Sequence, residues 1–303
     1  MQMRYLVHIG YPKAASTWLQ KNLFSGRSRH FRPLHDGRNV AYRKSGGKLF
    51  YDFIDEIAYV NPYVFDAVGA RKKLEAATEG NARVTVLSNE AWCGQPFSGA
   101  FGKTLAERIH AVVPEATILI VVRSQPEIIL SSYLHYLVKH GGTTRIDEFL
   151  RAEHWIRKPA FAPHYFQYID LIAFYDDLFG REKVVVLPFE TIRESTAAFV
   201  TPLYEAFQLQ PEDNLSSAAE NARNLRESTV LSQWPRLNLL ESRRARGAAL
   251  RAMMLTMSER RAERQRQALL DRIHNEVDDY YRTGNRRLEE RIGHDLASLG
   301  YPV

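Results

Sequence analysis

Short apolar runs rich in β-branched residues recur along the first 190 positions of the chain. Each run has the length of a strand and ends at a glycine, a proline or a polar residue, which predicts buried β-strands. The unbroken run Ala-Thr-Ile-Leu-Ile-Val-Val is typical of a strand that is covered on both faces. The predicted strands are residues 4–9, 83–88, 116–122 and 183–187.

The segments between these runs place apolar residues three and four positions apart, which predicts helices. The predicted helices are residues 17–24, 50–58, 63–77, 105–113, 125–139 and 165–179. Residues 25–48 are rich in Gly, Arg, His and Ser with little periodicity, so we expect a long irregular insertion there. After Pro188 the pattern is helical to the end of the chain. One apolar stripe in that part consists of Leu269, Ile273, Val277 and Tyr280.

Strands that alternate with helices predict the α/β class, with a central parallel sheet and helices on both faces. We expect a single domain over residues 1–303, in which residues 1–190 form the core and residues 191–303 form a helical C-terminal extension. Ligands of such sheets bind beyond the carboxyl ends of the strands. The segments that directly follow the predicted strands are therefore the first places to search for chemistry.

Composition and charge narrow the class of ligand. The chain is 45% hydrophobic and 25% charged, which is ordinary for a globular protein, and its net charge is +6. The stretch between Arg223 and Arg291 contains sixteen arginines and ten acidic residues. This excess of positive charge equals that of the whole chain. Positive charge favours an anionic ligand, although solvated helix faces account for it equally well. We expect most of these arginines to be solvated, a minority to line a path for a polyanion, and no nucleic-acid partner.

Cysteine usage and hydropathy bear on the compartment. The single cysteine, Cys93, excludes an intrachain disulfide framework and suggests a reducing setting. No apolar run approaches the roughly 18 residues that a membrane-spanning helix needs, and no basic-then-apolar leader is present. We therefore expect a soluble, cytoplasmic protein.

The segment after the first predicted strand has the chemistry of a phosphate-binding loop. Small and polar residues around Lys13 lead directly into a helical pattern, and Ser16 and Thr17 add hydroxyl groups. Unpaired N–H groups at the start of a helix, its dipole and a lysine together favour a phosphate. The Walker spacing does not match, because Lys13 comes three residues before Ser16 and no glycine directly precedes it. An ordinary surface turn is the alternative.

A second candidate anion site follows the third predicted strand. Arg123 ends that strand, and Ser131 comes eight residues later, two turns into a helix that begins near Pro126. An arginine and a serine so placed can converge on one anion. The alternative is an arginine that is paired with a carboxylate beside a buried helix.

Both segments resemble the nucleotide-binding segments of the sulfotransferase superfamily. The first resembles the family's 5′-phosphosulfate loop, Tyr-Pro-Lys-Ser-Gly-Thr-Thr-Trp-Leu, through Tyr11, Pro12, Lys13, Thr17, Trp18 and Leu19. Ala15 replaces a glycine of that pattern, and because alanine tolerates left-handed backbone poorly we expect the loop to differ in detail. The second resembles the 3′-phosphate segment, Arg-Asn-Pro-x-Asp-x4-Ser-Tyr, with Arg123, Ser131 and Tyr133 near the family's positions and Pro126 displaced by one.

The resemblance covers about residues 4–190, and residues 285–296 are similar to the closing segment of several bacterial and carbohydrate sulfotransferases. It implies 3′-phosphoadenosine 5′-phosphosulfate as the donor, 3′-phosphoadenosine 5′-phosphate as the product, a P-loop-like fold and no metal. The family's later Arg-Lys-Gly phosphate contact has no obvious counterpart, and residues 221–228 are the candidate replacement. The residues that the resemblance assigns to the nucleotide are Lys13, Ala14, Ala15, Ser16, Thr17, Trp18, Arg123 and Ser131.

Sulfonyl transfer needs an acceptor hydroxyl, a base for its proton and positive charge near the leaving phosphate oxygen. Lys13 fits the last role. Glu90 follows the second predicted strand, near the point where relatives place a histidine or a glutamate, and we assign it as the base. A salt-bridged or capping carboxylate is the alternative for Glu90. His135 is the second candidate base, and His8, inside a strand, is expected to be a satisfied core residue.

The resemblance predicts a sulfotransferase that acts on a hydroxyl acceptor, and the glutamate and the basic tail favour a carbohydrate or a glycolipid. A nucleotide-binding regulatory module that lacks turnover is the non-enzymatic alternative. A kinase-type phosphotransferase is a weaker alternative, because it would need a magnesium-binding carboxylate at a strand end and none follows Val122.

Overall fold

The computed structural model describes residues 4–25, 27–34, 57–58, 60–151, 161–212, 215 and 225–303. The chain divides into two compact units. The first unit comprises Met1–Arg123 and Tyr168–Ala218, and the second comprises Ser124–Gln167 and Ala219–Val303. These units cut across the predicted division at residue 190, and the single-domain assignment stays a prediction.

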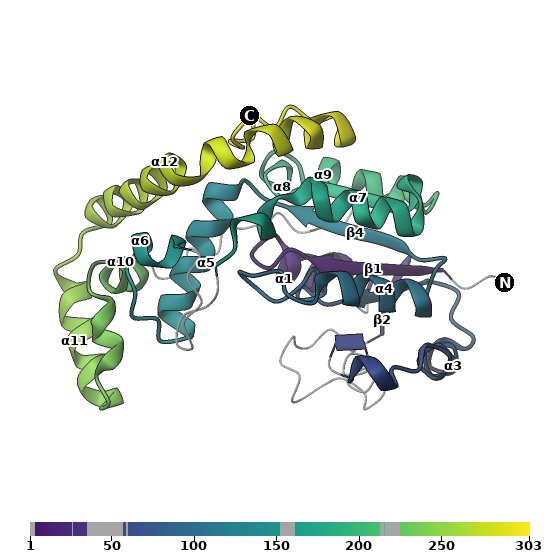
Figure 1. The fold of residues 1–303 in the computed structure, drawn as a ribbon, viewed down its shortest axis with the longest axis horizontal. Helices are drawn as coiled ribbons and strands as arrows, with labels where there is room; N and C mark the ends of the chain where they lie inside the picture. The colour runs from purple at the N-terminus through teal and green to yellow at the C-terminus, as the bar shows by residue number, and fades with distance from the viewer. Residues whose placement is uncertain are drawn as a thin grey trace. The chain divides into compact units, whose positions relative to one another are not determined.

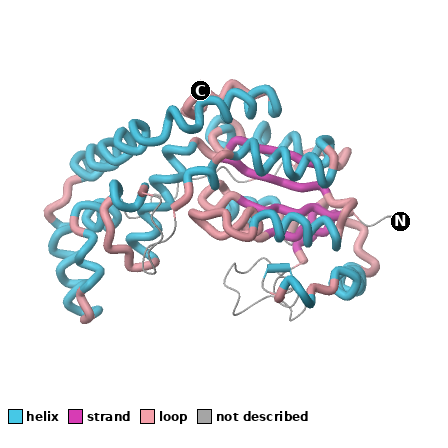
Figure 2. The backbone as a smooth tube through the Cα atoms, viewed as in Figure 1, coloured by secondary structure: helices cyan, strands magenta, loops and turns pink. Residues whose placement is uncertain are grey.

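The first unit is built on a five-stranded parallel sheet with the strand order β2-β3-β1-β4-β5 (Figure 1). The strands are β1 (Tyr5–Gly10), β2 (Phe31–Pro33), β3 (Val84–Ser88), β4 (Thr117–Val122) and β5 (Val184–Pro188). Every residue of β1, β3, β4 and β5 is buried, as parallel strands covered on both faces require. Helices flank the sheet (Figure 2), so the predicted α/β class with a central parallel sheet is confirmed.

The helices of the first unit follow the predicted positions closely. They are α1 (Ser16–Trp18), the π-helix η1 (Leu19–Leu23), η2 (Pro62–Val64), α3 (Ala67–Thr78), α4 (Gly102–Val112), α7 (Tyr168–Phe179), η4 (Arg181–Lys183), α8 (Thr191–Glu194) and α9 (Thr196–Ala206). Side-chain caps begin three of them: Asn61 accepts a hydrogen bond from the Tyr63 N–H at 3.1 Å, Asp66 accepts one from the Gly69 N–H at 2.9 Å, and Ser195 accepts one from the Ala198 N–H at 3.1 Å.

Two predictions for the first unit need correction. The predicted helix over residues 17–24 is one α-helical turn that continues as the π-helix η1. The predicted irregular insertion contains β2, which is too short to show a period but places Phe31 against Phe24, Tyr204 and Phe207. The rest of that insertion from residue 35 on, and the predicted helix 50–58 except Ile57 and Ala58, lie outside the described residues.

The described part of the second unit consists of helices and the loops that join them. Its helices are α5 (Gln125–Lys139), α6 (Ile146–Leu150), η3 (Pro163–Phe166), α10 (Leu225–Gln233), η5 (Pro235–Leu239), α11 (Arg243–Leu255) and α12 (Glu259–Ile292). Helix α5 has the predicted bounds and packs against α10 and α12. The predicted apolar stripe of α12 is correct except at its end, because Tyr280 is 49% exposed whereas Tyr281 is fully buried. Tyr281 keeps the four-residue spacing of the stripe.

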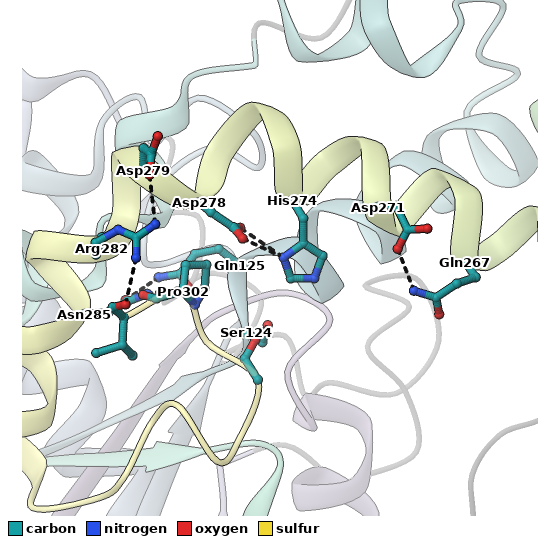
Figure 3. A network of polar contacts seen from close by, with 12 residues as sticks. Ser124, Gln125, Gln267, Asp271, His274, Asp278, Asp279, Arg282, Asn285 and Pro302 are labelled. Carbon is teal, nitrogen blue, oxygen red and sulfur yellow. Dashed lines mark hydrogen bonds and ion pairs between the residues drawn. The ribbon is translucent and has the colours of Figure 1, made fainter.

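A buried amide pair holds the last residues of the chain against the start of α5 (Figure 3). The Gln125 amide donates to Asn285 Oδ1 at 2.7 Å, and the Asn285 amide donates back to Gln125 Oε1 at 3.0 Å. Asn285 also donates to the Pro302 carbonyl at 2.6 Å, and the Ser124 hydroxyl donates to the Gly300 carbonyl at 2.7 Å. Asn285, the first residue of the segment over residues 285–296, therefore fastens the end of the chain to α5 within this unit.

Candidate functional site

The end of β1 lies against the turn that follows β3. Gly10 has φ +133°, and a Cβ at this position would come within 2.8 Å of both the Glu90 carbonyl oxygen and Cys93 Sγ. The Cys93 N–H donates to the Ile9 carbonyl at 3.0 Å, which joins the two segments through the backbone. Glycine is therefore required at position 10, and the start of the lysine-bearing loop is in direct contact with the segment that carries Glu90.

The loop after β1 adopts a left-handed backbone at two residues. Lys13 has φ 71° and Ala15, at the position of the family's glycine, has φ 58°. Ala15 thus adopts this conformation although its Cβ makes it unfavourable by about 1 kcal/mol. Ala15 is also the N-cap of α1, so the N–H groups of the first helical turn point out of the loop without an intrahelical acceptor.

The hydroxyl groups of the loop differ in their surroundings. Ser16 is buried, and its hydroxyl lies 3.5 Å from the Tyr11 carbonyl of the same loop. Thr17 is exposed, Lys13 and Trp18 are half-buried, and Ala14 is fully buried. The Tyr11 N–H donates to the Val121 carbonyl of β4 at 2.9 Å, which ties the loop to the neighbouring strand.

Arg123 joins the two sequence signatures in space. It directly follows β4, and its Nη1 donates to the Lys13 carbonyl at 3.1 Å. Its guanidinium also lies over the Phe189 ring, 4.8 Å from the ring centroid. A lysine and an arginine that are 110 positions apart in the sequence therefore meet at the carboxyl ends of β1 and β4, where a parallel sheet binds its ligands.

Two residues that contact Arg123, and a third that contacts one of them, were not predicted from the sequence. The Tyr168 hydroxyl, at the start of α7, donates to the Arg123 carbonyl at 2.6 Å. Phe189 follows β5 directly, and the Arg193 guanidinium lies 5.9 Å from its ring centroid. An aromatic residue directly after a buried strand was the available signal for Phe189, whereas nothing in the local sequence distinguishes Tyr168 or Arg193.

Glu90 is half-buried in the turn after β3. Asn89 shapes this turn, because its side chain accepts from the Ala91 N–H at 3.0 Å and its carbonyl accepts from the Trp92 N–H at 3.1 Å. Among the described residues, the Glu90 carboxylate caps no helix and forms no ion pair. Neither structural alternative for Glu90 is therefore present in that part of the chain.

His8 is a core residue, as predicted, but it is not fully satisfied, because its Nε2 is buried with no hydrogen-bond partner among the described residues. It is fully buried in β1, its Nδ1 lies 2.8 Å from the Ser88 hydroxyl of β3, and Gln20 donates to the same hydroxyl at 3.0 Å. Burial removes the solvation of the charged imidazolium and lowers the pKa of His8 to about 3. His8 is therefore neutral at physiological pH and links β1 to β3 beneath the site.

The remaining predicted residues lie in the second unit. Ser131 and His135 are half-buried on α5, and the His135 ring packs against His140 with 5.1 Å between centroids. Tyr133 is fully buried and donates to the Thr144 carbonyl at 3.2 Å, so it has a structural role. The assignments of Ser131 to the 3′-phosphate and of His135 as a second base stay predictions. Of the candidate replacement for the Arg-Lys-Gly contact, residues 221–224 lie outside the described residues.

Within the described ranges, none of the helices combines the length and the apolar character that crossing a membrane takes. The same ranges hold no group of three or more His, Cys, Asp or Glu side chains arranged to bind a metal ion.

Comparison with known proteins gives a result for the fold. No protein-family description and no curated protein matches the sequence. Among solved structures, a sulfotransferase from Alicyclobacillus acidocaldarius matches with a TM-score of 0.58 and 17% identity over 99% of each chain. The sulfotransferase domain from the curacin biosynthetic pathway matches with a TM-score of 0.46 and 15% identity, over 71% of this chain and 77% of that one. The chain therefore has the fold of a sulfotransferase, as the resemblance of its two loops predicted.

Proposed function

We propose that this protein is a sulfotransferase that moves the sulfonyl group of 3′-phosphoadenosine 5′-phosphosulfate to a hydroxyl acceptor. The observation that carries the proposal is the 3.1 Å hydrogen bond from Arg123 to the Lys13 carbonyl. It joins the segment that resembles a 3′-phosphate site to the segment that resembles a 5′-phosphosulfate site. The overall fold supports the same class of enzyme.

The residues present suit the donor nucleotide. Lys13 and Arg123 are cations at the ends of β1 and β4, and residues 16–18 supply N–H groups at the start of α1. We assign Lys13 and this helix start to the 5′ side of the donor and Arg123 to its 3′-phosphate. The assignment of Ser131 to the 3′-phosphate rests on the sequence resemblance alone.

The donor would supply an activated sulfonyl group, and the residues of the chain would manage charge and a proton around it. Glu90 would accept the proton of the acceptor hydroxyl as the new oxygen–sulfur bond forms. Lys13 would stabilise the negative charge on the 5′-phosphate oxygen as its bond to sulfur breaks. The products are the sulfate ester, 3′-phosphoadenosine 5′-phosphate and a protonated Glu90, so atoms and charge balance.

A carbohydrate or a glycolipid is the acceptor class that we propose, in a cytoplasmic setting. Glycosaminoglycan sulfotransferases, which the sequence resembles near Glu90, place a glutamate at this point. The arginine-rich C-terminal helices would attract an anionic acceptor. We propose that the reaction needs no metal.

The proposal is tested by thermal melting with nucleotides and by a transfer assay. We expect 3′-phosphoadenosine 5′-phosphate to raise the melting temperature far more than adenosine 5′-monophosphate, because only the former offers a 3′-phosphate to Arg123. At a hundred times its dissociation constant, the stabilisation should be about 2.7 kcal/mol. Equal shifts with both nucleotides would contradict the assignment of Arg123.

The transfer assay uses labelled donor with a panel of sugar, lipid and phenol acceptors and measures the mass increase of each. Sulfated sugar or glycolipid is the expected result. A selective melting shift without transfer to any acceptor would instead favour a nucleotide-binding regulatory module.

A further inference from the structure

Tyr168 connects the two halves of the proposed nucleotide site. It is the first residue of α7, it is 1% exposed, and its hydroxyl donates to the Arg123 carbonyl at 2.6 Å. The edge of its ring packs against Tyr11 of the phosphate loop, with 4.8 Å between centroids and 68° between planes. One buried side chain therefore contacts the loop after β1 and the residue that directly follows β4.

These contacts hold Arg123 at both of its ends. Tyr168 holds its carbonyl, while the Lys13 carbonyl and the Phe189 ring hold its guanidinium. The preceding carbonyl, that of Val122, accepts from the Phe189 N–H at 2.7 Å. With successive carbonyls engaged, the peptide groups around Arg123 have little freedom to rotate, and this defines the direction in which its side chain leaves the strand.

The contacts also close a circuit. Tyr11 packs on Tyr168, Tyr168 bonds to Arg123, Arg123 bonds to Lys13, and Lys13 lies two residues after Tyr11. A nucleotide with phosphates on its 3′ and 5′ positions presents two anions on one rigid ribose. Binding both anions at once requires the two cations to be held at a matching separation, whereas a 5′-monophosphate requires only one of them.

We propose that Tyr168 is a positioning residue that sets Arg123 relative to the phosphate loop and so gives the site its preference for a 3′,5′-bisphosphate nucleotide. This inference rests on the proposed function. It predicts that the Tyr168 hydroxyl contributes to the binding of the bisphosphate and contributes little to the binding of the monophosphate.

The test compares two Tyr→Phe substitutions in the same helix. Tyr168→Phe removes only the hydroxyl and keeps the ring that packs on Tyr11. Tyr175→Phe is the matched control, because Tyr175 is also 1% exposed and its hydroxyl has no hydrogen-bond partner among the described residues. Affinities for 3′-phosphoadenosine 5′-phosphate and for adenosine 5′-monophosphate are measured by calorimetry on wild type and both variants.

We expect Tyr168→Phe to lower the affinity for the bisphosphate by about three- to tenfold, which is the effect of one lost hydrogen bond. It should change the affinity for the monophosphate by less than about twofold. Tyr175→Phe should change neither. If the hydroxyl acts through Arg123, Tyr168→Phe should have no further effect on bisphosphate affinity when it is combined with Arg123→Ala.

Several results would overturn the inference. One is a Tyr168→Phe protein that binds both nucleotides more weakly by the same factor. Another is a Tyr168→Phe protein that keeps the wild-type preference for the bisphosphate. Either result would mean that Tyr168 does not act through Arg123, while the proposed function stands. A Tyr168→Phe protein that does not fold, beside a folded Tyr175→Phe protein, would make the hydroxyl purely structural. A wild type that binds neither nucleotide would overturn the inference and the proposed function together.

Discussion

The loops after β1 and after β3 follow equally buried strands, but they are held in different ways. The loop after β1 is bonded to the neighbouring strand β4 and the residue that follows it. The Tyr11 N–H donates to a carbonyl of β4, and Arg123 donates to the Lys13 carbonyl. The turn after β3 is held to β1 by the Cys93 backbone and is shaped by Asn89. Glu90 lies in the middle of that turn, and its backbone carbonyl accepts a hydrogen bond from the Cys93 thiol.

This difference predicts different effects for substitutions of Lys13 and of Glu90. In the first loop the conformation and the charged residues are interdependent, because Lys13 has a left-handed backbone and its carbonyl holds Arg123. In the second, the described neighbours of Glu90 form no ion pair with it, so its carboxylate can be changed without removing a known support of the fold. We therefore expect substitutions in the first loop to alter binding and substitution of Glu90 to alter chemistry.

The largest expected effect is on turnover. Glu90→Gln keeps the shape of the side chain but removes the proposed base, and loss of a general base typically lowers a rate by about a hundred- to ten-thousand-fold. Nucleotide affinity and melting temperature should remain those of the wild type. Steady-state kinetics and calorimetry on the same preparation check both.

A Glu90→Gln enzyme that keeps a third of wild-type turnover would return Glu90 to a structural role. His135→Gln is then the next substitution. A collapse of its turnover at unchanged nucleotide affinity would move the base to α5.

Lys13→Ala should combine a loss of turnover with a loss of nucleotide affinity of about ten- to a hundredfold, since a charge-assisted contact to the phosphate disappears. The substitution keeps the backbone carbonyl that holds Arg123. Calorimetry with 3′-phosphoadenosine 5′-phosphate measures the affinity. If Lys13→Ala lowered turnover but left nucleotide affinity unchanged, Lys13 would affect chemistry alone, as is expected of Glu90. The contrast between the two loops would then be wrong.

His8 gives a pH-dependent comparison, since it joins β1 to β3 beneath both loops. Its pKa is lowered to about 3 in the fold, so unfolded chains bind a proton that the folded chain excludes. The stability that neutral His8 provides is present above about pH 6.5 and is lost as the pH falls towards 3, by up to about 1.4 kcal/mol per pH unit.

Urea unfolding of wild type and His8→Gln at pH 7 and pH 5 measures this contribution. The variant should lose less stability than the wild type between the two pH values. Equal losses would mean that His8 is protonated in the fold or accessible to solvent.

The smallest expected effect concerns the left-handed residue of the first loop. Ala15→Gly should raise the unfolding free energy by up to about 1 kcal/mol, because glycine adopts this conformation without the Cβ clash. Ala14→Gly is the matched control and should lower the stability, because Ala14 is fully buried and does not have a positive φ. Chemical denaturation of both variants tests the pair, and a destabilised Ala15→Gly would contradict the strain at this residue.

The sequence by itself was sufficient for most of the strands and helices, while the site residues that it assigns stay predictions. Strands buried on both faces must be continuous apolar runs, so β1, β3, β4 and β5 were readable to within one or two residues. Helix α5 was readable because its turns are apolar and Gly141 follows it. Strand β2 has three residues and no period, and the α12 stripe was misassigned at Tyr280 because Tyr281 is equally apolar.

The tertiary structure decided which of these residues meet. Only the strand order β3-β1-β4 places the loop after β1 between the Glu90 turn on one side and Arg123 on the other. The contacts of Tyr168 and Phe189 with Arg123 join residues 45 or more positions apart, and such contacts leave no local periodicity in the sequence. The local sequence pattern determines which strands and helices form, because the burial of one face of an element sets which neighbouring positions along the chain must be apolar. The partners of Arg123 depend instead on how distant elements pack, and no local pattern records that.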